Sequence, residues 1–119
     1  MQIRGIRGAI SVEQNSEIEI LDNTKQLLKE IIQVNNIKLN DIISCLFTVT
    51  KDLDAVYPAV AARELGWTEI PLICVNEMLV SGSLEKVIRV LLHVNNIKSQ
   101  NEIIHVYLKR ANVLRPDLK

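Results

Sequence analysis

Arg89 is the residue of this sequence whose setting most strongly indicates chemistry. It lies inside the apolar run Val87–Leu92, where a guanidinium group gains nothing from water. Moving such an ion out of water costs several kcal/mol unless an opposite charge and hydrogen bonds compensate for the lost hydration. We therefore expect Arg89 to be buried beside a carboxylate or a bound anion. The sequence in this way predicts a charge-lined pocket.

The arginines are placed differently from the lysines. Arg7, Arg63 and Arg89 fall among apolar or small residues, whereas the lysines of the helical and loop segments fall on polar faces. Arginine binds planar carboxylates through two parallel hydrogen bonds, so this partition favours an anionic ligand. The alternative is that each arginine pairs with a structural acid such as Glu64 or Glu85. For any one arginine alone, both interpretations stay open.

Glu77 is the acid that we expect to balance such a pocket from within. It follows the apolar run Leu72–Val75 after a single polar residue, as a side chain at the end of a buried strand would. A carboxylate at that place can serve as an internal counter-charge for an arginine. The alternative is a solvated strand end, because acidic residues are mostly exposed.

The sequence lacks the motifs that are typical of several kinds of catalysis. The sequence contains no nucleophile elbow, no HExxH zinc motif, no phosphate loop and no dinucleotide fingerprint. His93 and His105 have no partner at metal-ligand spacing, so we interpret them as structural or surface histidines. Cys45 and Cys74 lie in apolar strand-like runs without CxxC spacing, which predicts two reduced thiols. We expect neither a metal nor a cofactor.

Charge and hydropathy exclude further classes of partner. The chain has 119 residues, with 14 Lys plus Arg, 14 Asp plus Glu and a net charge of zero. It has no like-charge block for a nucleic-acid or membrane surface, and no apolar stretch near the ~20 residues of a membrane span. Met1–Arg4 lacks the apolar stretch of a signal peptide. These features predict one domain over residues 1–119, working in the cytoplasm.

The patterning predicts two helices and five strands. Ser16 followed by Glu19 is a capping box, and apolar residues then recur at helical spacing to about Asn35. Pro58 suits the first position of a second, short helix, and Gly66 suits its C-terminal stop. The five predicted strands are Gln2–Val12, Asp41–Val49, Ile70–Val75, Lys86–Val94 and Ile103–Lys109.

Alternation within two of these strands predicts a chemically mixed face. In the strand that begins at Lys86, the even positions are apolar, which leaves Arg89 and His93 on the other face. In the last strand the even positions are apolar as well, which leaves His105 and Tyr107 opposite. The apolar positions are Ile88, Val90, Leu92 and Val94 in the first of these strands, and Ile104, Val106 and Leu108 in the second.

These elements together predict an α+β fold. One long helix can cover one side of a five-stranded sheet, but the other side also carries apolar residues and needs a cover. A neighbouring subunit is the simplest cover. The sequence therefore predicts an oligomer.

Short segments along the whole chain share their order and spacing with one known family. They are Arg4–Ala9, Pro58–Ala59 with Arg63, Cys74 with Glu77–Met78, Gly82–Leu84 before Val87–Val90, and His105–Leu108 before Leu114–Leu118. This set resembles the monofunctional chorismate mutases of the trimeric α/β class, which are distinct from the all-helical class. The resemblance implies a mixed five-stranded sheet with one long and one short helix. It also implies a homotrimer with a pseudo-α/β-barrel core and three active sites in clefts between adjacent subunits.

The reaction implied by this resemblance is the Claisen rearrangement of chorismate to prephenate, in aromatic amino-acid biosynthesis. This isomerase reaction is pericyclic and needs no nucleophile, base, metal or cofactor, which agrees with the missing motifs. The catalyst must hold the flexible enolpyruvyl arm in its reactive shape and stabilise the charge that separates as the ether bond breaks. The resemblance implies Arg89, Glu77 and Arg7 as the catalytic residues.

The family's pattern also implies a role for each contact. Arg89 donates to the ether oxygen as it becomes negative, and Glu77 and Cys74 contact the ring side where positive charge develops. Arg7 and Tyr107 hold a substrate carboxylate. Arg63 and Arg115 approach from the neighbouring chain or the C-terminal segment. Tyr57 and Leu114 help to wall the pocket.

Strict alternation would put Cys74 and Glu77 on opposite faces of their strand. We therefore expect the strand to end or bend near Val75, so that both reach one ligand. Two alternative functions stay open. One is an enamine/imine deaminase-type trimer, which also binds a carboxylate with an interface arginine. The other is a non-catalytic small-anion-binding trimer, because fold does not fix function.

Overall fold

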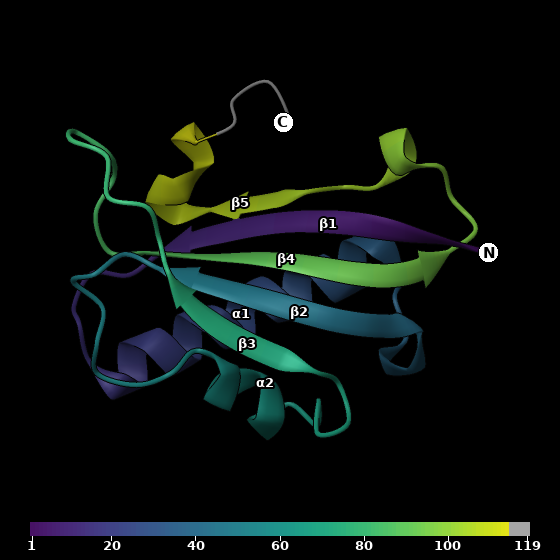
Figure 1. The fold of residues 1–119 in the computed structure, drawn as a ribbon, viewed down its shortest axis with the longest axis horizontal. Helices are drawn as coiled ribbons and strands as arrows, with labels where there is room; N and C mark the ends of the chain where they lie inside the picture. The colour runs from purple at the N-terminus through teal and green to yellow at the C-terminus, as the bar shows by residue number, and fades with distance from the viewer. Residues whose placement is uncertain (115–119) are drawn as a thin grey trace.

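Five strands form one mixed sheet, and both α-helices lie on the same side of it (Figure 1). The computed structural model describes residues 1–114. The strands are β1 (Gln2–Ser11), β2 (Ile42–Val49), β3 (Leu72–Asn76), β4 (Val87–Asn96) and β5 (Val106–Leu108). The helices are α1 (Glu17–Asn35) and α2 (Ala59–Glu64), with 3-10 turns η1 (Leu39–Asp41), η2 (Gln100–Glu102) and η3 (Lys109–Val113).

The strand order across the sheet is β3-β2-β4-β1-β5. The central β4 pairs with β1 and β2 in antiparallel fashion, whereas β2–β3 and β1–β5 are parallel pairs. The predicted α+β fold, with a mixed five-stranded sheet and one long and one short helix, is confirmed. The first four strands agree with the predicted ones except at their ends.

Helix α1 begins after Ser16, as predicted, and ends at Asn35. The Ser16 hydroxyl accepts a hydrogen bond from the backbone N–H of Glu19 at 3.1 Å, which satisfies one of the free amides at the helix start. The Glu19 carboxylate accepts from the N–H of Glu13 at 3.2 Å, in the loop before the helix. Asn36 ends the helix in the left-handed conformation, with φ of 53°.

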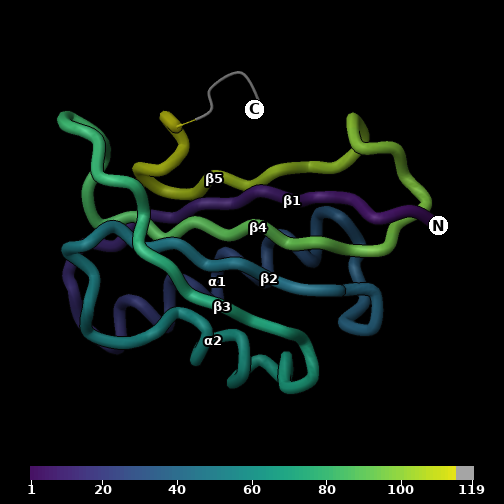
Figure 2. Tube along the Cα trace, in the orientation of Figure 1, coloured from purple at the N-terminus to yellow at the C-terminus, as the bar shows by residue number. Residues whose placement is uncertain are grey.

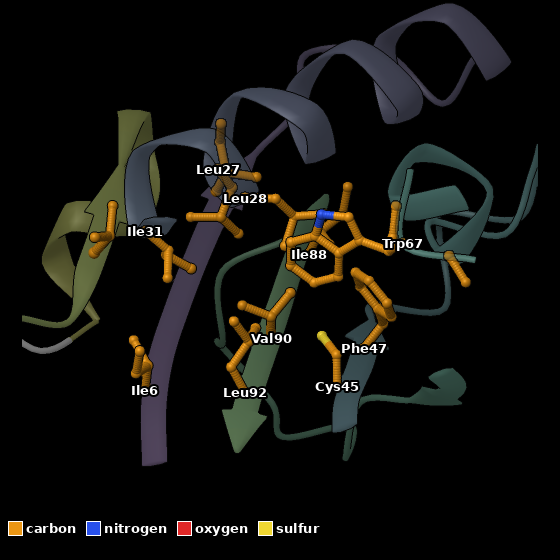
Figure 3. Close-up of a cluster of buried hydrophobic side chains, with 14 of the residues drawn as sticks. Ile6, Leu27, Leu28, Ile31, Cys45, Phe47, Trp67, Ile88, Val90 and Leu92 are labelled. Carbon is orange, nitrogen blue, oxygen red and sulfur yellow. The ribbon is translucent and has the colours of Figure 1, made fainter. Parts of the chain in front are cut away.

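The apolar side of α1 packs on the helix-covered face of the sheet (Figure 3). Leu27, Leu28 and Ile31 are fully buried there, and Trp67, which follows α2, fills the space beside them. Burying each such side chain contributes roughly 1.5–3 kcal/mol. The even positions of β4 are buried in this core, as their alternation predicted. The core therefore fixes the sheet as a rigid platform for its other face.

Helix α1 approaches β1 closely at Gly8. A Cβ atom at Gly8 would lie 2.7 Å from Cδ1 of Ile31 and 3.2 Å from both Cδ1 of Leu27 and the carbonyl oxygen of Val106. The missing side chain thus lets the helix and β5 pack tightly against β1. This close approach positions the strand that carries Arg7.

The short helix α2 also lies where the sequence predicts it. Pro58 stands at its N-cap, and Gly66 follows its end with φ of 96°, a conformation that glycine adopts at little cost. The helix packs against α1, where Lys25 and Glu64 form an ion pair at 2.8 Å. Arg63 in its last turn is exposed.

The last strand is shorter than predicted. Strand β5 begins at Val106, and the alternation expected from Ile103 fails, because Ile103 is buried whereas Ile104 is 49% exposed. The buried side chain of Asn35 explains the difference. Its amide nitrogen donates to the Ile104 carbonyl and its amide oxygen accepts from the Ile104 N–H, both at 2.8 Å. These bonds replace the strand ladder, so Ile104 turns away from the core.

The face of the sheet opposite the helices is open in the single chain (Figure 1). Ile73 on β3 and Ile3 on β1 are 60% and 62% exposed, and Val75 is 40% exposed. Polar and charged side chains stand among these apolar ones, which confirms the predicted mixed face. No helix within residues 1–114 is long and apolar enough to cross a membrane.

Candidate active site

A row of side chains runs across the open face of the sheet, one from each strand. Arg89 on β4 is paired with Thr48 on β2 and with Ala9 on β1. Thr48 is paired in turn with Val75 on β3, and Ala9 with Tyr107 on β5. Cross-strand partners point to the same face of a sheet. Arg89 therefore stands in the middle of this row, on the central strand.

The sequence predicted that Arg89 is buried, but the structure shows a partly exposed side chain. Its side chain is 44% exposed, because the apolar neighbours in its run alternate onto the helix-covered face or border an uncovered one. The expected carboxylate partner is present: Nε of Arg89 lies 3.9 Å from Oε1 of Glu77. This distance is longer than a hydrogen bond, so the two groups attract each other across a gap.

Glu77 is held at the open face by two further contacts. Its backbone N–H donates to the carbonyl oxygen of Val49 at 2.7 Å, which continues the β2–β3 pairing past the end of β3. The Thr48 hydroxyl donates to Oε1 of its carboxylate at 2.5 Å. Our sequence reasoning missed Thr48. Alternation along β2 could have indicated it. Phe47 is buried in the core, so Thr48, the next residue along the strand, points to the opposite face.

Two adjoining pockets open around this pair. One has a volume of about 240 Å³, and the other of about 160 Å³. Glu77 and Arg89 line both of them. The larger pocket is completed by Arg7, Gly8, Leu46, Thr48, Val90, Leu91 and Tyr107, and the smaller by Thr50, Met78, Val80, Ser83, Leu84, Val87 and Leu114. The structure thus brings together five sequence-predicted site residues: Arg7, Glu77, Arg89, Tyr107 and Leu114.

The two histidines make hydrogen bonds to neighbouring strands. The backbone N–H of Arg7 donates to Nδ1 of His105 at 2.9 Å, just before the β1–β5 pairing begins. His93 Nδ1 lies 3.1 Å from the Ser44 hydroxyl, across the β2–β4 pair. Within residues 1–114, no group of three or more His, Cys, Asp or Glu side chains is arranged to hold a metal ion.

Most of the other predicted site residues lie in a different part of the fold, near the β3 edge of the sheet. Tyr57 and Cys74 line a pocket of about 560 Å³ beside the β3 edge, together with the loop from Leu53 to Pro58. Tyr57 is 70% exposed, and Arg63 lies near the Cys74 thiol. Arg115 lies outside the described residues. In one chain, therefore, the predicted residues form two separate groups.

Strand β3 ends close to Val75, as expected, but its end does not bring Cys74 and Glu77 to one face. Strand β3 continues to Asn76, and alternation is kept: Cys74 is paired with Phe47, whose side chain is buried in the core, whereas Glu77 lies on the open face. Cys74 and Glu77 of one chain therefore do not face one ligand. Burial raises the pKa of the Cys74 thiol, while a hydrogen bond from the Ala59 backbone and the charge of Arg63 act in the opposite direction.

A small α+β chain with two arginines and one carboxylate around a shallow open pocket is suited to binding a small carboxylate and stabilising separated charge. Comparison with known proteins identifies the family. The family model described as chorismate mutase type I matches residues 3–118. The chain belongs to this family of isomerases. The chorismate mutase resemblance found in the sequence is thereby confirmed.

Individual relatives agree with this assignment. The chain is 52% identical over 119 residues to the chorismate mutase AroH of Bacillus subtilis (strain 168), covering 99% of this chain and 94% of that protein. It is 43% identical over 118 residues to the chorismate mutase AroH of Thermus thermophilus, covering 98% and 97%. A solved chorismate mutase from Clostridium thermocellum superposes with a TM-score of 0.90 at 54% identity, covering 92% of this chain and 97% of that one. The deaminase-type and non-catalytic alternatives are not favoured.

Proposed function

We propose that this protein converts chorismate to prephenate, with Arg89 and Glu77 as the central catalytic residues. The observation that carries the proposal is the Arg89–Glu77 pair, which borders a pocket that also holds Arg7 and Tyr107. Family membership supplies the reaction, and the pair supplies charges of both signs at one place. A pericyclic rearrangement needs such charges and a fixed substrate shape, rather than a nucleophile.

Arg89 acts on the oxygen that becomes negative. As the ether C–O bond breaks, electron density gathers on that oxygen, and the guanidinium donates a hydrogen bond to it. Because Arg89 lies within a ten-residue strand and is paired on both sides, its Cα does not have to move when this charge develops. Its contribution is greatest in the transition state, so it increases kcat more than substrate affinity.

Glu77 acts on the opposite charge. Its carboxylate faces the part of the ring system that becomes positive when the ether bond breaks. Arg7 and Tyr107, which approach from β1 and β5, hold a substrate carboxylate and so restrict the enolpyruvyl arm. Leu114 walls the adjoining pocket.

A complete site needs a second subunit in this proposal. Tyr57, Arg63 and Cys74 lie near the β3 edge, away from the pocket of Arg89 and Glu77. We infer that a neighbouring chain brings its copy of this edge to the open sheet face, and that Arg115 approaches from the C-terminal segment. A cyclic homotrimer closes such a head-to-tail contact and buries the exposed apolar side chains of the sheets in a barrel-like core. The enzyme acts in the cytoplasm.

The direct test is incubation of the purified protein with chorismate. We expect first-order loss of the chorismate diene absorbance and formation of prephenate, with no metal or cofactor added. A trimer that leaves chorismate unchanged above the uncatalysed background would contradict the proposal.

A further inference from the structure

The carboxylate of Glu77 has to reach across one strand to act beside Arg89. Figure 2 shows β2 lying between β3, which leads to Glu77, and β4, which carries Arg89. The hydrogen bond from the Glu77 N–H to Val49 fixes only its backbone. A glutamate side chain has several rotatable bonds, and fixing them costs conformational entropy. A contact beyond the backbone must therefore hold the carboxylate in place.

Thr48 is placed to supply that contact. It lies on β2 directly beside Arg89, and its hydroxyl donates to Oε1 of Glu77 at 2.5 Å. Arg89 approaches the same oxygen only to 3.9 Å, which is beyond hydrogen-bond distance. The hydroxyl thus anchors the carboxylate, and the arginine keeps hydrogen-bond donors for a ligand.

We propose that Thr48 is a positioning residue, which acts on the reaction by fixing the Glu77 carboxylate. The inference rests on the proposed function of Glu77. A preorganised charge stabilises a transition state without first being ordered, so loss of the anchor lowers kcat. Because Thr48 acts through Glu77 rather than through the substrate in this proposal, the KM changes little.

The test compares two substitutions that separate the hydroxyl of Thr48 from the shape of its side chain. Thr48→Val removes the hydroxyl and keeps the branched shape, whereas Thr48→Ser keeps the hydroxyl and removes a methyl group. We expect kcat to fall about tenfold in Thr48→Val, equivalent to about 1.4 kcal/mol of barrier, with KM within about twofold of wild type. Thr48→Ser should retain kcat within about twofold. Thr48→Ala is a second donor-free variant, in case Thr48→Val does not assemble.

A double-mutant cycle separates positioning from a structural effect. In a Glu77→Ala background, Thr48→Val should cause no further loss of kcat, because the group that Thr48 positions is gone. Ser44→Ala is the matched control, since Ser44 carries another β2 hydroxyl, which contacts His93 rather than Glu77. It should leave kcat unchanged.

Three results would overturn the role of Thr48 alone while wild type still rearranges chorismate. They are an undiminished kcat in both donor-free variants, an equal kcat loss with and without Glu77, and a serine variant as slow as the valine variant. A wild-type trimer that does not rearrange chorismate would overturn the proposed function, and the role of Thr48 with it.

Discussion

Arg89 and Glu77 face each other across strand β2, with Nε and Oε1 3.9 Å apart, although β4, which carries Arg89, and β3, which leads to Glu77, are not neighbours in the sheet. Both side chains are partly exposed, at 44% and 28%, so this ion pair by itself adds little to the free energy of unfolding. Its importance is in the arrangement of charge. The pair places a cation and an anion at the border of one small pocket.

Substitution of Arg89 should affect turnover rather than folding. We expect Arg89→Lys to lower kcat at least ~10²-fold, because an ammonium group cannot reproduce the planar donors of a guanidinium group. Arg89→Ala should lower it by at least as much. Steady-state kinetics on protein with wild-type assembly tests this. Near-wild-type turnover in the lysine variant would remove Arg89 from the mechanism.

Glu77 and Cys74 should respond differently to substitution. Glu77→Ala should lower kcat strongly, by at least ~10²-fold, because it removes a charge aimed at the transition state. Cys74→Ser should be mild, since a hydroxyl replaces the weak hydrogen bonds of a thiol. Kinetics of both variants, with thiol alkylation of the wild type, provides the comparison. Complete inactivation by the serine swap and by alkylation would indicate covalent chemistry and contradict the pericyclic mechanism.

Mixed oligomers should recover activity that each parent variant lacks. Arg63 and Arg89 belong to the two separate groups of site residues, so the proposed trimer takes them from different chains. Mixing inactive Arg63→Ala with inactive Arg89→Ala subunits should therefore restore some turnover, because some interfaces then hold both arginines. Sedimentation should give a trimer. No recovery after verified subunit exchange would place the site within one chain.

A methyl group at Gly8 should destabilise the fold. Its Cβ would lie 2.7 Å from Cδ1 of Ile31, so Gly8→Ala should lower the free energy of unfolding by about 1–3 kcal/mol. Gly5→Ala is the matched control on the same strand, because its Cβ would meet Leu91 at an ordinary 3.8 Å. Urea unfolding of both variants measures the difference. Equal stability of the two would show that α1 shifts freely away from β1.

The buried thiol of Cys45 should make stability depend on alkaline pH. Burial, with a smaller effect of Cys74, raises its pKa above the ordinary value. The unfolded chain then releases a proton that the folded protein keeps, so this contribution is complete below the ordinary thiol pKa and is lost above it. Above about pH 9, the free energy of unfolding should fall by about 1.4 kcal/mol per pH unit from this thiol.

Unfolding titrations of wild type and Cys45→Ala across this pH range isolate the effect. The alanine variant is expected to be less stable overall, because it leaves a small cavity in the core. Its stability should nevertheless decline less steeply with pH. Identical slopes in the two proteins would show that the Cys45 thiol ionises as readily folded as unfolded.

Local patterns predicted the parts of the fold that local forces determine. The cap at Ser16, the stop at Gly66 and the alternation along β4 each follow from the chain's own neighbours. The strand at Ile103 was predicted too long, because its hydrogen bonds are taken by Asn35, a residue far away in sequence. No local pattern contains that contact.

The sequence predicted which residues form the candidate site better than it predicted how they are arranged. Arg7, Glu77, Arg89 and Tyr107 meet as expected, but Arg89 is half-exposed, because burial depends on what covers a sheet face and not on a residue's neighbours in sequence. Thr48 was missed for a related reason. The sequence around Thr48 does not indicate that a carboxylate from a distant segment accepts a hydrogen bond from its hydroxyl.

The parallel pairing of β5 with β1 places Tyr107 beside Ala9, so residues far apart in the sequence meet in one pocket. During synthesis, Arg7 leaves the ribosome long before Tyr107 has been joined to the chain. The last strand inserts beside the first only after everything between them has been made. A nascent chain that stops short of Tyr107 therefore lacks one wall of this pocket, however well its first four strands are paired.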